Sequence, residues 1–200
     1  MEKPAATEHA ITDVLRRRWS PRAFDPRPVE REKLLSVLEA ARWAASSNNE
    51  QPWSYIVATK DDAAEYEKLL SCLVPGNQTW AKNAPVLMLS VVKTIFARNN
   101  TPNRVALHDV GAASAQLTAE ALTLGLFVHQ MAGIELGRVR HLYALPDNHD
   151  PVAAIAIGYP GDPAMLDEKL RERETAPRTR KHLSEFVFAG SFGTPVPLVK

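Results

Sequence analysis

The sequence contains a single cysteine, Cys72, among its 200 residues. One cysteine excludes an internal disulfide and any metal site built from several thiolates, so we expect a small buried apolar residue here. The polar segment Met1–Glu8 lacks the apolar core of a signal peptide, and no apolar run approaches the roughly 20 residues of a membrane-spanning helix. These absences predict a cytoplasmic protein with no membrane partner.

An excess of one charge is also missing, because 24 Lys and Arg residues face 23 Asp and Glu residues, for a formal net charge of +1. Proteins that bind nucleic acid through its phosphates normally carry a basic excess along one face, so that class is excluded. The absence of a Gly-x-Gly-x-x-Gly motif and of a Walker loop argues against a Rossmann fold or a nucleotidase. No metal-ligand spacing is present, so surface or core positions are expected for His108, His129, His141, His149 and His182.

What is present is an ordinary globular composition, with 45% hydrophobic and 24% charged residues. Without repeats or linkers, residues 1–200 are interpreted as one domain. Periodicity predicts helices at 29–45, 61–70, 105–124, 135–145 and 164–174, and strands at 54–59, 86–92, 127–130 and 152–157. Strands interspersed with helices indicate a layered α/β or α+β fold.

Some segments have more specific expectations. The strand at 86–92 is nearly all apolar and should be buried on both faces, and the helix at 105–124 should be largely buried. Residues 75–78 are predicted to form a turn, and the charges of the helix at 164–174 to face solvent. The tail contains Phe186, Phe188 and Phe192 among turn residues, which suits it poorly to closing on its own domain. We expect it to lie across a partner subunit.

Two short motifs carry most of the functional information. Arg18-Trp19-Ser20-Pro21-Arg22 concentrates cations and a hydroxyl at the end of a helix, as an anionic ligand requires, although cations there also suit the helix macrodipole. Ser46–Trp53 gathers amides and hydroxyls at a helix-to-strand turn, as a planar polar heterocycle requires, although Pro52 makes part of this segment structural. With a further basic cluster at 178–181, the motifs predict a site for a phosphorylated ring cofactor.

The same motifs resemble those of the FMN-dependent nitroreductase family. Residues 18–24 are similar to its Arg-x-Ser-x-Arg-x-Phe opening, and residues 46–53 to its Ser-Ser-x-Asn-x-Gln-Pro-Trp motif. Later landmarks follow in the same order at 108–109, 125–126, 131–134, 157–160 and 178–180. The resemblance covers roughly His9 to Pro195.

The resemblance implies an intertwined homodimer of α+β subunits, each with a mixed or antiparallel sheet flanked by helices. FMN would lie at each of two interface sites lined by both subunits. The family reduces nitroaromatics, quinones and similar small acceptors with electrons from NADH or NADPH in a ping-pong cycle.

The resemblance also implies a set of cofactor-binding residues. Arg18, Ser20 and Arg22 would contact the ribityl phosphate and the polar edge of the ring, with Trp19 either walling the site or packing. Arg178 and Arg180 would close over the phosphate, which their planar guanidinium groups suit. The implied residues on the ring side are Ser47, Asn49, Gln51, Ala132 and Gly133.

Asn49 offers a donor and an acceptor to the ring edge, and glycine at 133 permits a close main-chain approach to the reactive nitrogen. The best-studied members carry an acidic residue where Ala132 stands, which makes nicotinamide use less secure than FMN binding. No acid, base or nucleophile is required, because the cofactor performs the hard step, and no catalytic residue is assigned.

Three functional hypotheses follow. The first is an FMN-dependent NAD(P)H oxidoreductase acting on nitro compounds, quinones or other electron-poor acceptors. The second is a flavin-binding protein with little turnover, acting in FMN storage or sensing. The third is a specialised flavin enzyme of the same fold, which the short span between Gln78 and Asn103 disfavours because it leaves little room for a lid.

Overall fold

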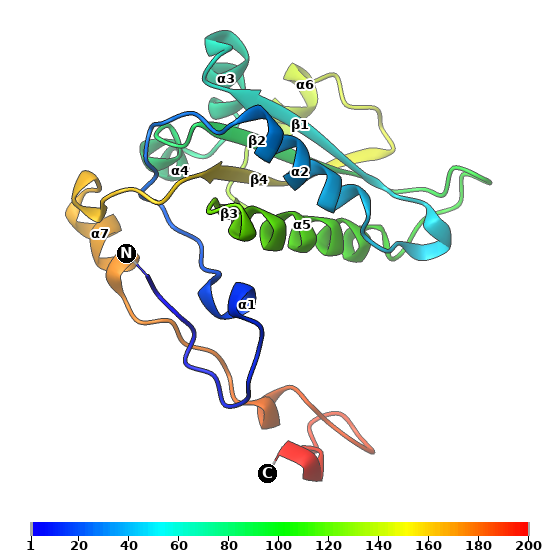
Figure 1. Ribbon diagram of the computed structural model, residues 1–200. Helices are drawn as coiled ribbons and strands as arrows, with labels where there is room; N and C mark the ends of the chain where they lie inside the picture. The colour runs from blue at the N-terminus through cyan, green and yellow to red at the C-terminus, as the bar shows by residue number, and fades with distance from the viewer. Residues whose placement is uncertain (1, 200) are drawn as a thin grey trace.

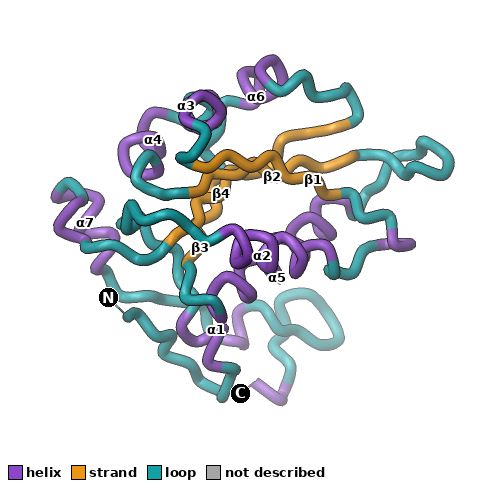
Figure 2. Tube along the Cα trace, turned by 45° about the horizontal axis from the view of Figure 1, so that its top comes forward, coloured by secondary structure: helices purple, strands orange, loops and turns teal. Residues whose placement is uncertain are grey.

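The computed structural model describes residues 2–199 of the chain. A sheet lies between helices, and a narrower region containing both ends of the chain extends from one end of it (Figure 1; Figure 2). The helices are α1 (Asp13–Arg17), α2 (Arg31–Arg42), α3 (Ala63–Leu70), α4 (Pro75–Ala81), α5 (Ala106–Thr123), α6 (Leu136–Leu142) and α7 (Glu168–Thr175). The strands are β1 (Trp53–Thr59), β2 (Val86–Lys93), β3 (Phe127–Met131) and β4 (His149–Gly158). Short 3-10 turns are η1 (Ser47–Asn49), η2 (Pro163–Met165), η3 (Leu183–Glu185) and η4 (Pro197–Val199).

The sheet is antiparallel throughout, with strand order β1-β2-β4-β3, which confirms the α+β expectation. β3 is half the length of β4, and its last paired residue, Met131, lies opposite Ala154. The first residues of β4, from 149 to 153, therefore have no β3 partner on that side. This open edge is one wall of a cavity described below.

Both faces of the sheet are covered, because side chains alternate between them along each strand. Leu87 and Leu89 of β2 pack with residues of α3, α4 and α6 in one core cluster. Val86 and Met88 pack with residues of α2 and α5 in the other. The continuous apolar run of β2 is thus buried on both sides, as its sequence predicts.

Three expectations from the sequence need correction. Residues 75–78 do not form a simple turn, since helix α4 begins at Pro75, whose fixed φ suits a first helical position. Helix α5 is buried along one side only, and its small residues Gly111 and Ala115 are exposed with Leu107. Helix α7 begins at Glu168, preceded by η2, and not all of its charges face solvent.

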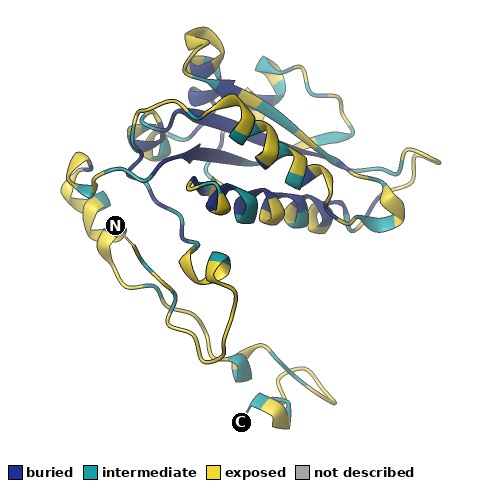
Figure 3. Cartoon of the chain, viewed as in Figure 1, coloured by how far each residue is buried: buried dark blue, intermediate teal, exposed yellow. Residues whose placement is uncertain are grey.

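The C-terminal arm, residues 176–199, runs away from the sheet beside the N-terminal segment (Figure 1). Contacts between the two include the bond from Arg178 Nη1 to Lys3 O and the pair formed by His182 and Glu8. The arm is largely exposed (Figure 3), with Phe192 96% and Leu198 89% accessible. The expectation that this tail does not close on its own domain is therefore confirmed for the single chain.

Candidate functional site

A basic pocket of about 240 Å³ lies between the segment after α1 and the chain just after α7. It is lined by Lys3, Arg18, Trp19, Ser20, Arg22, Arg173, Glu174, Ala176, Pro177, Arg178 and Arg180. Six of these side chains are cations and one is a carboxylate. The structure thus brings together the five phosphate-binding residues expected from the sequence, from both ends of the chain, in a pocket whose charge suits an anion.

The segment that enters this pocket is positioned by a buried aromatic. Trp19 packs edge-on against Phe127, with ring centroids 6.1 Å apart, and belongs to a small core cluster with Leu122. Its neighbours Arg18 and Ser20 are only partly buried, and Arg18 Nη1 donates to Ser20 Oγ at 3.3 Å. Trp19 therefore both packs in the core and lines the pocket.

Glu174 is the residue that organises the pocket, and the sequence interpretation missed it. Its carboxylate is 1% exposed and accepts hydrogen bonds from the main-chain N–H groups of Arg22 at 2.9 and 3.0 Å and Ala23 at 3.0 Å. These bonds join positions about 150 residues apart in sequence. The clue available in the sequence was spacing, since Leu170 and Glu174 are four residues apart and share a helical face.

The cations of the pocket are partly desolvated. Burial is the main cause lowering the pKa of the Arg18 guanidinium, and the neighbouring charge of Arg180 lowers it further. Burial also lowers the pKa of Arg22, an effect that Glu174 opposes, and that of Arg178. Arginines remain charged at neutral pH, so the pocket holds crowded positive charge that a bound anion would relieve.

The two C-terminal arginines differ in their contacts. Arg178 Nη1 donates to the carbonyl oxygens of Lys3 at 2.5 Å and Arg16 at 3.1 Å, so it ties the N-terminal segment to the pocket. Arg180 donates only to the adjacent Thr179 O, at 2.7 Å, among the described residues. Arg178 is thus committed to the fold, whereas Arg180 is available to a ligand.

His129 supports the pocket from behind. Its Nδ1 lies 2.8 Å from Pro21 O, and because a carbonyl only accepts, Nδ1 carries the proton. The imidazole packs against Trp80 at 4.6 Å between ring centroids, and the Arg22 guanidinium lies 6.0 Å from the same Trp80 ring. Burial is the main cause that lowers the pKa of His129 to about 4, so it is a neutral packing residue that holds the backbone beside Arg22.

The amide segment, Ser46–Gln51, forms the tight turn η1 before β1. Asn48, Asn49 and Gln51 have φ values of 53°, 55° and 52°, a left-handed region that Asn tolerates better than most residues. The Ser47 N–H donates to Asp109 Oδ2 at 3.1 Å. The exposed Asn49 side chain makes no hydrogen bond within residues 2–199 and is free to meet a ligand.

A single chain does not bring the amide segment to the basic pocket. In Figure 1 the turn that follows α2 lies at the opposite end of the molecule from α7. The amide segment and the basic pocket, which are two parts of the expected site, are therefore separated within one chain.

Ala132 and Gly133 follow β3, where the chain passes the start of α4. The Gly133 carbonyl accepts hydrogen bonds from Val74 N and Asn77 Nδ2, both at 3.1 Å. A Cβ at position 133 would lie 2.5 Å from Asn77 Nδ2 and 2.8 Å from Val74 Cγ2, so a larger residue would displace these two side chains. Asn77, unnoticed in the sequence, thus positions this main chain, while the exposed Ala132 lines the cavity at the open edge of β4.

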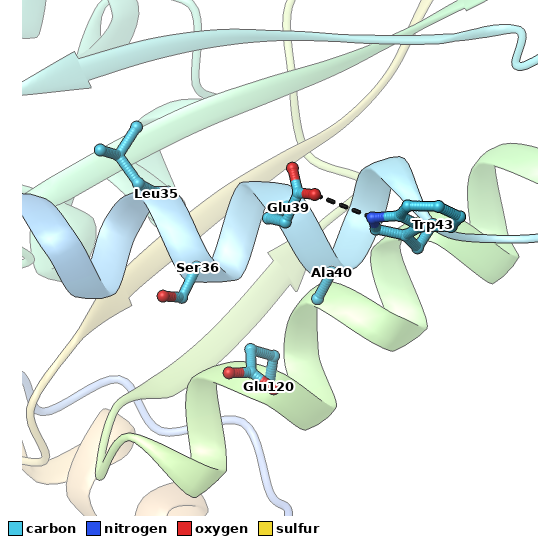
Figure 4. Close-up of a pocket in the computed structure, with 6 residues that line it drawn as sticks. All are labelled: Leu35, Ser36, Glu39, Ala40, Trp43 and Glu120. Atoms are coloured by element: carbon cyan, nitrogen blue, oxygen red, sulfur yellow. Dashed lines mark hydrogen bonds between the residues drawn. The ribbon is translucent and has the colours of Figure 1, made fainter.

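A further groove of about 610 Å³ lies between α2 and α5 (Figure 4). It is lined by Leu35, Ser36, Glu39, Ala40, Trp43 and Glu120. The pKa of Glu39 is lowered to about 2, mainly by hydrogen bonds from Arg42 and less by one from Trp43 Nε1 at 2.8 Å. With two carboxylates and no cation in its lining, this groove does not suit a phosphate.

Across residues 2–199, every helix is too short or too polar to traverse a lipid bilayer. In the same residues, no three or more His, Cys, Asp or Glu side chains gather as a metal ion would require. Cys72 is free and buried.

Comparisons with known proteins agree with this geometry. A family model described as the nitroreductase family matches residues 15–159. The chain is 37% identical over 136 residues to an uncharacterized 15.4 kDa protein of Mycolicibacterium smegmatis, covering 68% of this chain and 90% of that protein. It is 28% identical over 187 residues to the Bacillus subtilis FMN reductase [NAD(P)H], covering 77% and 69% of the two chains.

Solved structures are similar over nearly the whole chain. A crystal structure described as an oxidoreductase containing FMN has a TM-score of 0.88 and 37% identity, covering 94% of this chain and 96% of its own. A nitroreductase family protein from Clostridium difficile has a TM-score of 0.72 and 25% identity, covering 92% and 100%. With its motifs in order and its basic pocket assembled, the chain belongs to the nitroreductase family.

Proposed function

We propose that the protein is an FMN-dependent NAD(P)H oxidoreductase that reduces nitroaromatic, quinone or similar electron-poor acceptors, with residues 1–200 acting as one FMN-binding domain. The basic pocket is the observation that carries the proposal, because crowded arginines without matching carboxylates fit a phosphate dianion. The names of similar proteins, which include an FMN reductase [NAD(P)H] and putative NAD(P)H nitroreductases, support the same chemistry.

The residues fit FMN as follows. Arg18, Arg22 and Arg180, with the Ser20 hydroxyl, would hold the phosphate. The main-chain N–H groups of Ala132 and Gly133 donate to no oxygen in the described turns and loops, so they remain available to the ring. When bound in this site, FMN would supply the redox chemistry between the nicotinamide donor and the acceptor.

A homodimer is part of the proposal, because the amide segment lies far from the basic pocket of its own chain. Asn49, Ser47 and Gln51 of a second copy would complete each site by reading the polar edge of the ring. Two apolar features support association, namely the exposed stripe of Leu107, Gly111 and Ala115 on α5 and the arm with its exposed phenylalanines. The free thiol of Cys72 fits our proposal of a cytoplasmic location.

The protein's own residues hold and orient the reactants, and none is assigned a proton-transfer step. Orientation of the two reactants and electrostatic tuning of the ring are the contributions expected from the protein. Ala132 has no carboxylate to order a water or the nicotinamide, so binding of the donor would depend on main-chain groups and the partner.

The proposal is tested on the purified protein under anaerobic conditions. A yellow protein that NADH or NADPH bleaches, and that a nitroaromatic or quinone reoxidises, supports it. A yellow protein that neither nicotinamide bleaches would instead favour storage or sensing of FMN. A colourless protein that takes up no added FMN would refute both.

A mixed dimer tests whether two subunits share each site. One chain carries Arg18→Glu and the other Asn49→Gly, and subunits are exchanged. If each site uses Arg18 of one chain and Asn49 of the other, the heterodimer has one intact site and binds one FMN per dimer tightly. If both residues came from the same chain, every site would be defective and tight binding would be absent.

A further inference from the structure

Lys3 is a cation of the basic pocket that none of the sequence motifs accounts for. It lines the pocket together with the arginines of those motifs. It also precedes residues 15–159, which the family model matches, so membership of the family assigns it no role. Its presence in the pocket is therefore a feature of this chain that needs an explanation of its own.

Main-chain hydrogen bonds hold the N-terminal segment against the pocket. Arg178 Nη1 donates to Lys3 O at 2.5 Å, and Ala5 N donates to Arg16 O at 2.8 Å. Because neither bond uses the side chain of Lys3, a substitution at this position leaves both bonds in place. The backbone thus delivers the lysine side chain to the pocket.

The ammonium group of Lys3 is only partly used by the protein. Its Nζ donates to Glu174 O at 2.6 Å and lies 5.0 Å from the centroid of the Trp19 ring. An ammonium carries three donors, and the other two have no acceptor among residues 2–199. Two N–H groups of Lys3 are therefore available to a ligand of the pocket.

The electrostatic surroundings of Lys3 also favour an anion. Burial is the main cause that lowers the pKa of its ammonium, and the carboxylate of Glu174 opposes this effect. The positive charges of Arg178 and Arg22 lower the pKa further. Like charges held this close repel one another, and an anion placed among them would relieve the repulsion.

A second donor in the pocket lining lacks an acceptor. Trp19 is 6% exposed, and its Nε1 has no hydrogen-bond partner within the described residues. Buried polar groups in folded proteins almost always have a partner. Unused donors on both Lys3 and Trp19 suit a ligand with several acceptor oxygens, which a phosphate monoester has.

We propose that Lys3 is a further phosphate-binding residue, through which the N-terminal segment makes the pocket select phosphorylated flavin over riboflavin. Its ammonium would donate to a phosphate oxygen while keeping its bond to Glu174 O, as a charge-assisted hydrogen bond. The inference rests on the proposed function, because FMN supplies the phosphate. It adds a ligand from outside the family motifs and states which group of the cofactor that ligand recognises.

The test compares the binding of FMN and riboflavin to flavin-free protein, followed by the change in flavin fluorescence. Lys3→Met removes the ammonium but keeps an unbranched side chain, so the FMN Kd should rise about tenfold through loss of one charge-assisted hydrogen bond. The riboflavin Kd should not change, because riboflavin has no phosphate. Lys3→Arg keeps the charge and should restore most of the affinity. Lys169→Met, at an exposed position on α7, removes the same charge and should leave both Kd values unchanged.

The pattern of Kd values decides between a ligand and a structural lysine. A rise for FMN alone, reversed in Lys3→Arg, supports the proposal. Equal rises for FMN and riboflavin would overturn it, because they would assign Lys3 to holding the N-terminal segment in place. An unchanged FMN Kd in Lys3→Met, or an equal rise in Lys169→Met, would overturn it as well.

Inorganic phosphate, titrated by calorimetry, separates this inference from the proposed function. Phosphate binding that weakens in Lys3→Met, in a protein that takes up no flavin, would refute the oxidoreductase and keep Lys3 as a phosphate ligand. Bleaching of bound flavin by NADH or NADPH, with an unchanged FMN Kd in Lys3→Met, would refute the role of Lys3 alone. A protein that binds neither flavin nor phosphate would refute both.

Discussion

The basic pocket and the amide segment are built in contrasting ways. The pocket is completed within one chain by contacts that span most of the sequence, such as Glu174 with Arg22 and Arg178 with Lys3. The amide segment is held mainly by its neighbours in sequence, including the bond from Gln51 N to Ser46 Oγ, and its Asn49 side chain points to no partner in the described chain. One region is preorganised for an anion, whereas the other presents polar groups outward.

In the proposed function, this difference separates two parts of cofactor recognition. Anchoring a phosphate needs concentrated charge held in place, which one subunit provides. Reading a ring edge needs amides at the correct distance from that anchor, and one subunit does not supply them there. Substitutions in each region measure how strongly each part contributes.

The largest effect is expected from reversing a charge in the pocket. Arg18→Glu places a carboxylate beside the phosphate, so the FMN Kd should rise at least about 100-fold. Isothermal titration of the flavin-free protein measures this change. Arg31→Glu, an exposed arginine on α2, is the matched control and should change Kd less than threefold. Equal effects of the two variants would mean that only overall charge matters.

The variant Glu174→Gln distinguishes the role of Glu174 in positioning the backbone from its effect on the charge of the pocket. Removing the carboxylate makes the pocket more positive, so affinity for an anion should rise if charge alone mattered. Because Glu174 accepts from two main-chain N–H groups, those of Arg22 and Ala23, we instead expect FMN affinity to fall and stability to drop by about 2 kcal/mol. Urea unfolding and flavin titration measure the two effects. The control is Glu172→Gln on the same helix, where the side chain is exposed and little change is expected.

The amide segment is tested with two adjacent asparagines that share a backbone conformation. Asn48 and Asn49 have φ values of 53° and 55°, and glycine tolerates both. Asn49→Gly should weaken FMN binding about tenfold, because one hydrogen-bonding side chain is lost. Asn48→Gly should leave binding unchanged. If both variants bind FMN normally, the asparagines serve only the turn.

The smallest effect is expected on the pH dependence of stability, through His129, which packs behind the pocket. The pKa of His129 is lowered to about 4, below the value of about 6.5 expected in the unfolded chain. Between these values the unfolded chain binds a proton that the native chain does not, so stability falls as pH decreases. The loss between pH 7 and 5.5 is on the order of 1 kcal/mol.

Urea unfolding at the two pH values measures the His129 contribution. His129→Gln should remove most of this pH dependence, whereas His108→Gln, at an exposed position on α5, should preserve it. A pH dependence that survives His129→Gln would assign it to other groups.

Much of the fold could be predicted from the sequence, because apolar periodicity is a local property. The apolar run at 86–92 became β2, and the Ala- and Leu-rich stretch became α5. The start of helix α4 was not predicted, because proline and glycine, as at Pro75 and Gly76, are common in turns, although proline also suits a first helical position. The residue types alone did not distinguish a turn from the start of a helix.

The candidate site was predictable only in part. Arginines and a serine at short spacing indicate an anion site, and the structure places Arg18, Ser20, Arg22, Arg178 and Arg180 around one pocket. Glu174 was interpreted as a surface charge, because its partners are main-chain N–H groups that no sequence pattern displays. Asn77 was missed for the same reason, since its partner is the carbonyl of Gly133.

The sequence by itself determined the family, the layered α+β fold and the kinds of groups available for binding, because these depend on residue type and spacing. The tertiary structure alone decided which groups meet. It buried Glu174 beneath the arginines, kept the turn that follows α2 away from them and opened a cavity where β3 stops short of β4. Such juxtapositions depend on long-range packing, in which a strand's length or a helix's orientation brings together residues more than a hundred positions apart.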